Sequence, residues 1–121
     1  MKYMLLCYDD EGAWEKAGQA ALEAAMKEAV GLTHELDQKG QYILASPLQE
    51  ASTASSVRVR DGQPIVTAGP YVETREVLGG FYLIDVENLD QALAIAARHP
   101  GARLGTVEVR PVLEIPNLPA S

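Results

Sequence analysis

Cysteine, tryptophan, phenylalanine and long apolar runs are scarce in this sequence of 121 residues. Its one cysteine, Cys7, excludes an intramolecular disulfide and a metal site made of cysteines alone. The apolar run after Lys2 is short and ends at Asp9 and Asp10, so it fits neither a signal peptide nor a membrane span. We therefore expect a soluble, cytoplasmic protein with no membrane partner, in which Cys7 is a buried structural thiol rather than a nucleophile.

Basic residues are also few, because 10 Lys and Arg stand against 17 Asp and Glu and the formal net charge is -7. Non-specific nucleic-acid binding depends on neutralising phosphates, so we expect no nucleic-acid partner. All lysines precede Gly40, and all arginines lie from Arg58 onward. Arginine matches carboxylates, so the second half could hold a small anionic ligand; a solvated surface with scattered ion pairs is the alternative.

The remaining pattern predicts one domain over residues 1–115 and a C-terminal tail over 116–121. Apolar runs predict strands at 2–8, 41–48, 79–86 and 105–115, and Asp61-Gly62 predicts the turn of a hairpin between 51 and 71. Apolar spacings of 3 and 4 predict a long helix over 13–39, ended by Gly40. A second helix over 87–100 has Asn88 as its N-cap, Gln91 three residues later, and Pro100 as its stop.

With the hairpin set aside, this order is βαββαβ, the α+β pattern of a ferredoxin-like sandwich with both helices on one face of the sheet. Its other face mixes apolar residues with charged ones such as Glu108 and Arg110. A half-apolar face of this kind needs a cover. We expect a homodimer, sheet against sheet, with a cavity of mixed polarity between the two copies.

The runs "AGPYVETREVLGGFYLIDV" and "LDQALAIAARHPGARLGTVEVRPV" resemble the YCII-related family, specifically its branch with the Asp-Gly-Pro-Phe (DGPF) motif. The resemblance covers essentially the whole chain. It implies a ferredoxin-like domain that pairs into a dimeric α/β barrel, and a function that is largely unassigned. Some members resemble enzymes of small ring compounds, and others are fused to sigma-70-type factors.

This sequence departs from the family at several positions. The motif appears as Ala68-Gly69-Pro70-Tyr71, which lacks the Asp and has Tyr in place of Phe. Shorter members carry a His on the first helix and, near the end of the second helix, an Asp before a Pro, and they are suspected enzymes for that reason. The corresponding positions here are Ala29 and His99, so the resemblance carries neither half of that pair.

The connector from Thr67 to Gly80 has a fixed shape, because Pro70 restricts φ and the pair Gly79-Gly80 permits close backbone approach. We expect Tyr71, Glu73, Thr74 and Arg75 at the rim of the cavity or at the dimer edge; a rigid turn without function is the alternative.

His99 lies at a helix end, before a proline, where an imidazole that titrates near neutrality could act as a general base or hold an anion. Capping its own helix is the alternative. Tyr71 is a second candidate for proton transfer. Arg58 and Arg110 are candidate anion holders on strand faces, with Glu108 beside Arg110. Ion pairs with Glu108, Glu73 or Glu76 are the plain alternative.

His34 lies opposite the apolar stripe of its helix and is expected in solvent. No His, Asp and Glu set has metal-ligand spacing, and there is no phosphate loop, so we expect no metal and no cofactor. Three functions stay open: an enzyme or binding protein for a small anionic molecule, aromatic or keto/enol, at the dimer cavity; an accessory module that contacts a sigma-70-type factor; and a dimeric scaffold without chemistry.

Overall fold

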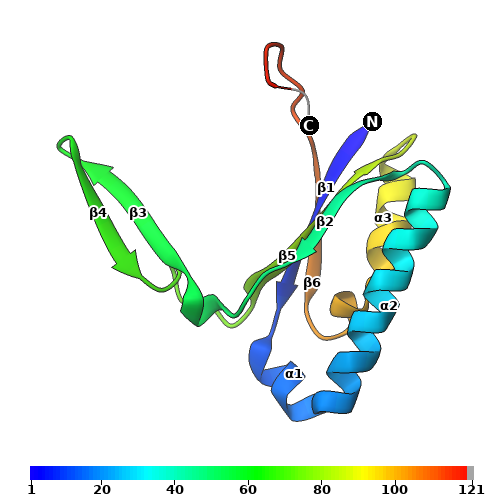
Figure 1. Cartoon of the computed structure of the whole chain (residues 1–121), viewed down its shortest axis with the longest axis horizontal. Helices are drawn as coiled ribbons and strands as arrows, with labels where there is room; N and C mark the ends of the chain where they lie inside the picture. The colour runs from blue at the N-terminus through cyan, green and yellow to red at the C-terminus, as the bar shows by residue number, and fades with distance from the viewer. Residues whose placement is uncertain (120–121) are drawn as a thin grey trace.

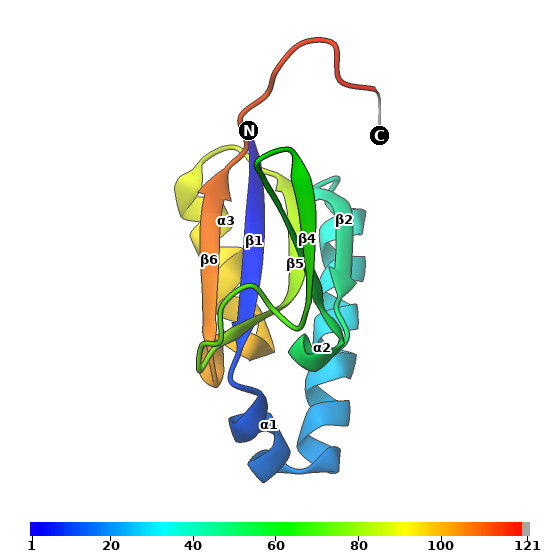
Figure 2. The ribbon, with the colours of Figure 1, turned by 90° about the vertical axis from the view of Figure 1, so that its left-hand side faces the viewer.

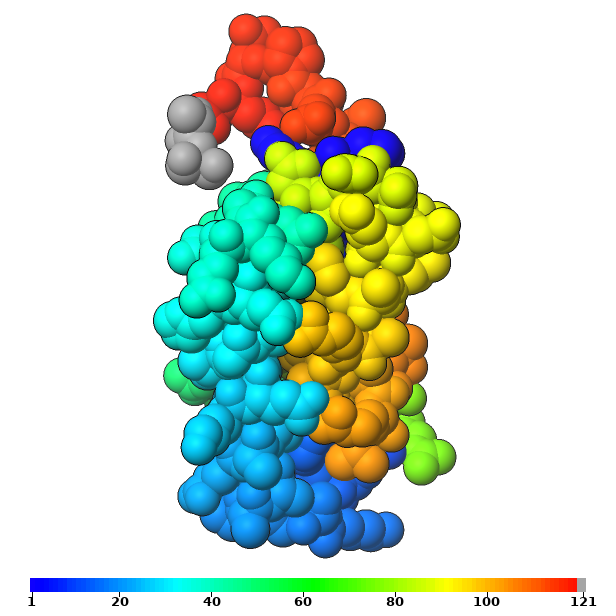
Figure 3. Space-filling model, turned by 90° about the vertical axis from the view of Figure 1, so that its right-hand side faces the viewer, coloured from blue at the N-terminus to red at the C-terminus, as the bar shows by residue number. Residues whose placement is uncertain are grey.

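The structure is a computed structural model that describes residues 1–119. One antiparallel sheet has the strand order β2-β5-β1-β6 and consists of β1 (Lys2–Asp9), β2 (Tyr42–Pro47), β5 (Val77–Asp85) and β6 (Thr106–Pro111). Two helices, α2 (Gln19–Gln38) and α3 (Leu89–Arg98), lie side by side over one face of this sheet (Figures 1 and 3). The expected ferredoxin-like α+β arrangement is confirmed for the single chain.

The core fills the space between the helices and the covered face of the sheet. Buried residues alternate along β1 and recur at helical spacing on α2 and α3, as periods of 2 and 3.6 require. Three side chains are fully buried, one from each of β1, α2 and β5: Leu5, Leu36 and Ile84. Cys7 is buried among them, as expected for a structural thiol, whereas His34 is exposed.

The long helix expected over 13–39 is in fact two helices, α1 (Glu11–Ala17) and α2. Gly18 joins them with a φ of 95°, outside the helical region and in a range that side-chain-bearing residues avoid. The composition is rich in Ala, Glu and Lys on both sides of this glycine, so the periodicity alone did not reveal the break. Gly40 ends α2 with a φ of 70°, as predicted.

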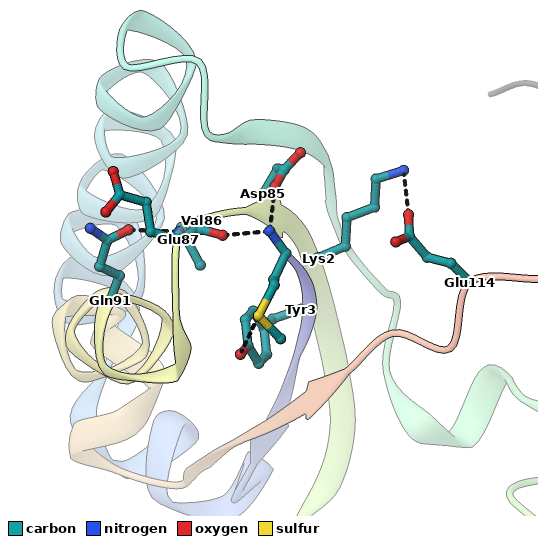
Figure 4. Close-up of polar contacts among 8 residues, drawn as sticks. Lys2, Tyr3, Asp85, Val86, Glu87, Gln91 and Glu114 are labelled. Atoms are coloured by element: carbon teal, nitrogen blue, oxygen red, sulfur yellow. Dashed lines mark hydrogen bonds and ion pairs between the residues drawn. The ribbon is translucent and has the colours of Figure 1, made fainter.

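The last strand was expected to reach residue 115, but β6 ends at Pro111. Its partner β1 sets this limit, because Tyr3 pairs with Pro111 and little of β1 remains beyond that point. An ion pair between Lys2 and Glu114, 3.2 Å long, holds the chain after β6 (Figure 4). In contrast, β5 begins at Val77, two residues before the strand predicted from 79.

The N-terminus of α3 has the predicted cap. Asn88 Oδ1 accepts a hydrogen bond from the backbone N–H of Gln91 at 2.9 Å. The Gln91 side chain in turn accepts one from the backbone N–H of Glu87, also at 2.9 Å, so the reciprocal bond ends one residue earlier than in a standard capping box (Figure 4).

The predicted hairpin is formed by β3 (Ser55–Arg60) and β4 (Gln63–Ala68), which pair only with each other. Asp61 and Gly62 both have positive φ, 51° and 73°, as a two-residue hairpin turn of type I′ demands. The hairpin projects from the molecule on the side of the open sheet face (Figures 1 and 2). Two short 3-10 helices, η1 (Ala51–Thr53) and η2 (Pro100–Arg103), complete the described chain. Within residues 1–119, no helix has the length and apolar character that crossing a membrane requires.

A candidate site in the groove between the helices and the sheet edge

A groove of about 970 Å³ lies on the helix side of the sheet, between α1, α2, η2 and the strands β2 and β5, of which β2 is the edge strand. Its size lies at the upper end of the range of small-molecule sites. Apolar side chains from α2 form one wall, namely Leu22, Ala25, Met26, Ala29 and Val30. The groove therefore combines an apolar wall with the polar groups described next.

His99 is turned into this groove. The extended backbone of His99 (φ -69°, ψ 131°), which the following proline favours, ends α3. The imidazole packs edge to face on Tyr82 with ring centroids 5.3 Å apart, and its Nε2 lies 4.0 Å from Cys7 Sγ. Its Nδ1 accepts a hydrogen bond from the backbone N–H of Gly101 at 3.0 Å. The ring thus caps η2 rather than the carbonyls of its own helix.

Burial lowers the pKa of His99 below its ordinary value of 6.5. The carboxylate of Glu28 opposes this shift, and the guanidinium of Arg103 adds to it. Glu28 and Arg103 also bind each other at 2.7 Å. Burial is the largest of these influences, so the neutral imidazole is favoured at neutral pH.

Asp9 is the main polar group of the groove that the sequence analysis did not single out. It ends β1, and the chain leaves room for its carboxylate at two glycines. A Cβ at Gly79 would lie 1.7 Å from Asp9 Oδ2, and a Cβ at Gly101 would lie 3.6 Å from Asp9 Oδ1. Burial, followed by the nearby Glu11, raises the pKa of Asp9, although the neighbouring indole of Trp14 favours the ionised form.

Cys7 and Tyr82 also line the groove, but neither ionises near neutral pH. Burial, reinforced by Asp9, raises the pKa of the Cys7 thiol to about 12. Burial likewise raises the pKa of Tyr82 to about 12, and its hydroxyl donates a hydrogen bond to the Ala29 carbonyl at 3.2 Å. A thiol protonated to this degree is a poor nucleophile, which agrees with a structural role for Cys7.

The predicted connector residues lie outside the groove. Tyr71 is 75% exposed, and Glu73 is exposed as well. Arg75 Nε binds Asp10 Oδ2 at 3.0 Å, and the Ala13 N–H together with Arg75 holds the pKa of the Asp10 carboxyl below its usual range. The structure brings His99 together with Asp9, and not with Tyr71, Glu73 or Arg75.

The predicted anion-holding residues lie elsewhere too. Arg58 is exposed on the hairpin, in register with Ile65. Glu108 and Arg110 are exposed on β6, opposite Leu6 and Met4 of β1, on the sheet face that the helices leave open. Within residues 1–119, Arg58 and Arg110 form no ion pair, so the pairing with Glu108, Glu73 or Glu76 offered as the alternative is not what the structure shows.

The residues that replace the two family positions do come together. Ala29 on α2 and His99 after α3 both line the groove, although 70 positions of sequence separate them. Across the described part of the chain, no three His, Cys, Asp or Glu side chains cluster in a way that would hold a metal ion.

Comparison with known proteins identifies the family. The YCII-related domain matches residues 1–116. The chain belongs to the YCII-related family. It is also 36% identical over 117 residues to an uncharacterized protein of Rhizobium meliloti (strain 1021), a match that covers 93% of this chain and 92% of that relative. The family match therefore includes every helix and strand of this YCII-related chain.

Proposed function

We propose that this YCII-related protein, of the DGPF branch, binds a small uncharged molecule with an apolar or aromatic body in the groove and transfers a proton on it. The observation that carries this proposal is the inward-facing His99 ring, which lines the same groove as Asp9 and an apolar wall of α2. A pair of titratable groups with displaced pKa values in a concave site is typical of functional sites.

The charges of the groove favour an uncharged ligand over the anionic one expected from the sequence. Its walls carry four carboxylates, and no lysine or arginine is among the described residues that line it; the acidic residues are Asp9, Glu11, Glu15 and Glu50. An anion would be repelled by this lining, because like charges at short range raise the free energy of the complex. Arg58 and Arg110, the proposed anion holders, lie away from it.

The shifts at Asp9 and His99 suit proton transfer. The pKa of Asp9 is raised and that of His99 is lowered, so the difference between the two pKa values is smaller than between free side chains. The raised pKa of Asp9 lies nearer the working pH, where a general base is more effective, and the lowered pKa of His99 leaves its ring neutral and able to donate an N–H hydrogen bond. Proton transfer therefore needs no further cofactor in this groove.

We also propose that the protein works as a homodimer that pairs through the open face of the sheet. This face carries partly buried apolar residues in the middle strands, Met4, Leu6, Phe81 and Leu83, next to Glu108 and Arg110. A face on which apolar residues lie next to one acidic and one basic side chain can pair with a copy of itself about a twofold axis. The groove lies on the other side of the sheet, so its walls come from one chain and a second copy on the open face would not form them.

Binding can be measured with the single tryptophan of the chain, because Trp14 lines the groove. Phenylacetone and phenylpyruvate form a matched pair of probes, since they differ only in a methyl group against a carboxylate. We expect phenylacetone to change Trp14 fluorescence in a saturable way and phenylpyruvate to bind more weakly.

The matched variants are Ala29→Phe, which fills the groove, and Ala24→Phe, on the exposed side of the same helix. Ala29→Phe should abolish phenylacetone binding and Ala24→Phe should not. Equal binding by both variants would show that the groove is not the site, and would favour the scaffold or the sigma-factor contact. Tighter binding of phenylpyruvate would contradict the uncharged ligand class.

A further inference from the structure

We infer that His99 works as a neutral N–H donor through Nε2, that Asp9 is the group that accepts the proton, and that the ligands are therefore uncharged carbonyl compounds with an acidic C–H next to the carbonyl. This inference rests on the proposed function of the same groove, and it reverses the role of general base that the sequence suggests for His99.

The hydrogen bond at Nδ1 determines the tautomer of His99. The backbone N–H of Gly101 points at Nδ1 from 3.0 Å, and an N–H can donate only to a nitrogen that bears no hydrogen. In the neutral imidazole, the hydrogen must then be on Nε2. Gly101 lies in η2, directly after Pro100, so its amide is fixed by regular backbone. A Cβ at Gly101 would lie 2.9 Å from Nδ1, which shows how closely the backbone and the ring are fitted.

This tautomer can donate a hydrogen bond through Nε2 but is poorly placed to accept a proton. In this tautomer Nδ1 carries the only lone pair that could accept a proton, and that lone pair already accepts the hydrogen bond from the Gly101 N–H. Protonation of Nδ1 would break this hydrogen bond and bring the new N–H of the ring against the N–H of Gly101. The Nε2–H is on the side of Cys7, whose Sγ lies 4.0 Å away. A thiol sulfur is a weak acceptor at that distance. This N–H is therefore free to donate to a stronger acceptor, such as a ligand oxygen, and His99 is poorly suited to act as a base.

Asp9 lies on the same side of the groove as Gly101, the partner of His99. A Cβ at Gly101 would be close both to Asp9 Oδ1, at 3.6 Å, and to His99 Nδ1, so the carboxylate and the imidazole approach the same glycine. The groups that face Asp9 are Glu11 of α1, Glu76 just before β5 and the indole of Trp14. Burial, followed by the two carboxylates, raises the pKa of Asp9 and makes it a stronger base than a solvated aspartate. Both groups line the groove, so a ligand bound there can contact the Asp9 carboxylate and the His99 ring together.

These two groups suit one reaction step. The carbonyl oxygen of the ligand accepts a hydrogen bond from His99 Nε2–H, and Asp9 removes a proton from the neighbouring carbon. The electron pair of that C–H bond forms the C=C bond of an enolate, and the C=O π pair moves onto the oxygen, where His99 stabilises it. Return of the proton from Asp9 completes the cycle, so no oxidant, metal or second substrate is consumed.

The tautomer can be measured without any ligand. Nitrogen-15 NMR of selectively labelled histidine distinguishes the two neutral forms and separates His99 from the exposed His34. We expect the hydrogen of His99 on Nε2 above the pH at which the ring protonates. A hydrogen on Nδ1 would overturn the inference even if every binding result of the proposed function held.

The proton transfer can be followed as exchange of the benzylic hydrogens of phenylacetone for deuterium in D2O. The variants are Asp9→Asn, His99→Gln, which keeps an N–H donor without a basic nitrogen, and His99→Ala, which keeps neither. Removing a general base lowers a rate by roughly 10² to 10⁴-fold, so Asp9→Asn should lose the exchange within that range. His99→Gln should retain clearly more activity than His99→Ala. Circular dichroism and Trp14 binding curves of each variant separate these effects from misfolding.

Each other outcome has a definite meaning. If His99→Gln is as inactive as His99→Ala while Asp9→Asn still exchanges hydrogen, then His99 is the base and the inference fails. If phenylacetone binds but the wild type exchanges no faster than buffer, the proton-transfer step fails while the binding site stands. If phenylacetone does not bind, the proposed function fails for this ligand class, and the inference fails with it.

Discussion

At the scale of single residues, three glycines decide what can lie next to the sheet. Gly79 makes room for the Asp9 carboxylate, and Gly80 packs on the backbone of β2, where a Cβ would be 2.9 Å from the Ser46 carbonyl oxygen. Gly105 packs against the backbone of Tyr8, where a Cβ at Gly105 would lie only 2.1 Å from the Tyr8 carbonyl oxygen. None of these three has positive φ, so their need for glycine comes from close contact rather than from backbone conformation.

Gly80→Val tests this contact. The new side chain would meet the backbone of β2, which cannot move without breaking its pairing with β5, so we expect a loss of about 1 to 3 kcal/mol in the free energy of unfolding. The matched control is Gly31→Ala on α2, where a Cβ has open space and should add about 0.5 to 1 kcal/mol through helix propensity. Urea unfolding measures both, and an unchanged stability in Gly80→Val would show that the contact is incidental.

At the scale of elements, the hairpin differs from the rest of the fold. Pairing places Val57 opposite Val66 and Val59 opposite Pro64, so one face of the hairpin is apolar and the other carries Arg58 and Ile65. Val57, Val59 and Val66 are 63%, 60% and 69% exposed. A two-stranded hairpin is at best marginally stable alone. In a single chain this element should therefore open far more often than β1 and β5.

Hydrogen exchange can test this contrast. In dilute protein we expect the amides of β3 and β4 to exchange much faster than those of β1, because local opening of the hairpin exposes no core. If a second copy covers the apolar hairpin face, protection of the hairpin should rise with protein concentration while that of β1 stays the same. A hairpin as protected as β1 at every concentration would contradict a free arm.

At the scale of the whole molecule, one face of the sheet is covered by helices and the other is open (Figure 2). Ion pairs from Arg98 to Glu35 and from Arg103 to Glu28 tie α3 and η2 to α2 on the covered side. On the open side, the central apolar residues are flanked by Glu108 and Arg110, which is the setting of the proposed dimer.

Leu83→Glu should dissociate this dimer, because a buried carboxylate without a partner is strongly unfavourable. The control is Leu93→Glu on the outer side of α3, 47% exposed, where a charge stays in solvent. Sedimentation velocity at micromolar concentration should show a monomer for Leu83→Glu and a dimer for both Leu93→Glu and the wild type. A wild-type monomer would overturn the proposed assembly.

Local signals determined much of this fold from the sequence alone. The apolar run of β1, the Asp61-Gly62 turn, the Asn88 cap and the Gly40 end all depend on residues close in the chain, and each was predicted. The motifs that identified the family are likewise contiguous runs of sequence. The break at Gly18 was missed, because a glycine within a helical pattern is usually tolerated and only the backbone angle shows otherwise.

The site was decided by the tertiary structure. His99 was a candidate from the sequence, but its direction depends on Gly101, Tyr82 and Cys7, which come from three different elements. Asp9 looked like the polar end of a strand, and it gained a pocket only because Gly79 and Gly101 approach it from distant parts of the chain. Periodicity reports which face a residue is on, whereas the meeting of side chains from different elements follows from how the helices pack on the sheet. The sequence by itself therefore determined the order of the strands and α-helices and all of them but the separate helix α1, and the packing decided which of their polar groups share a groove.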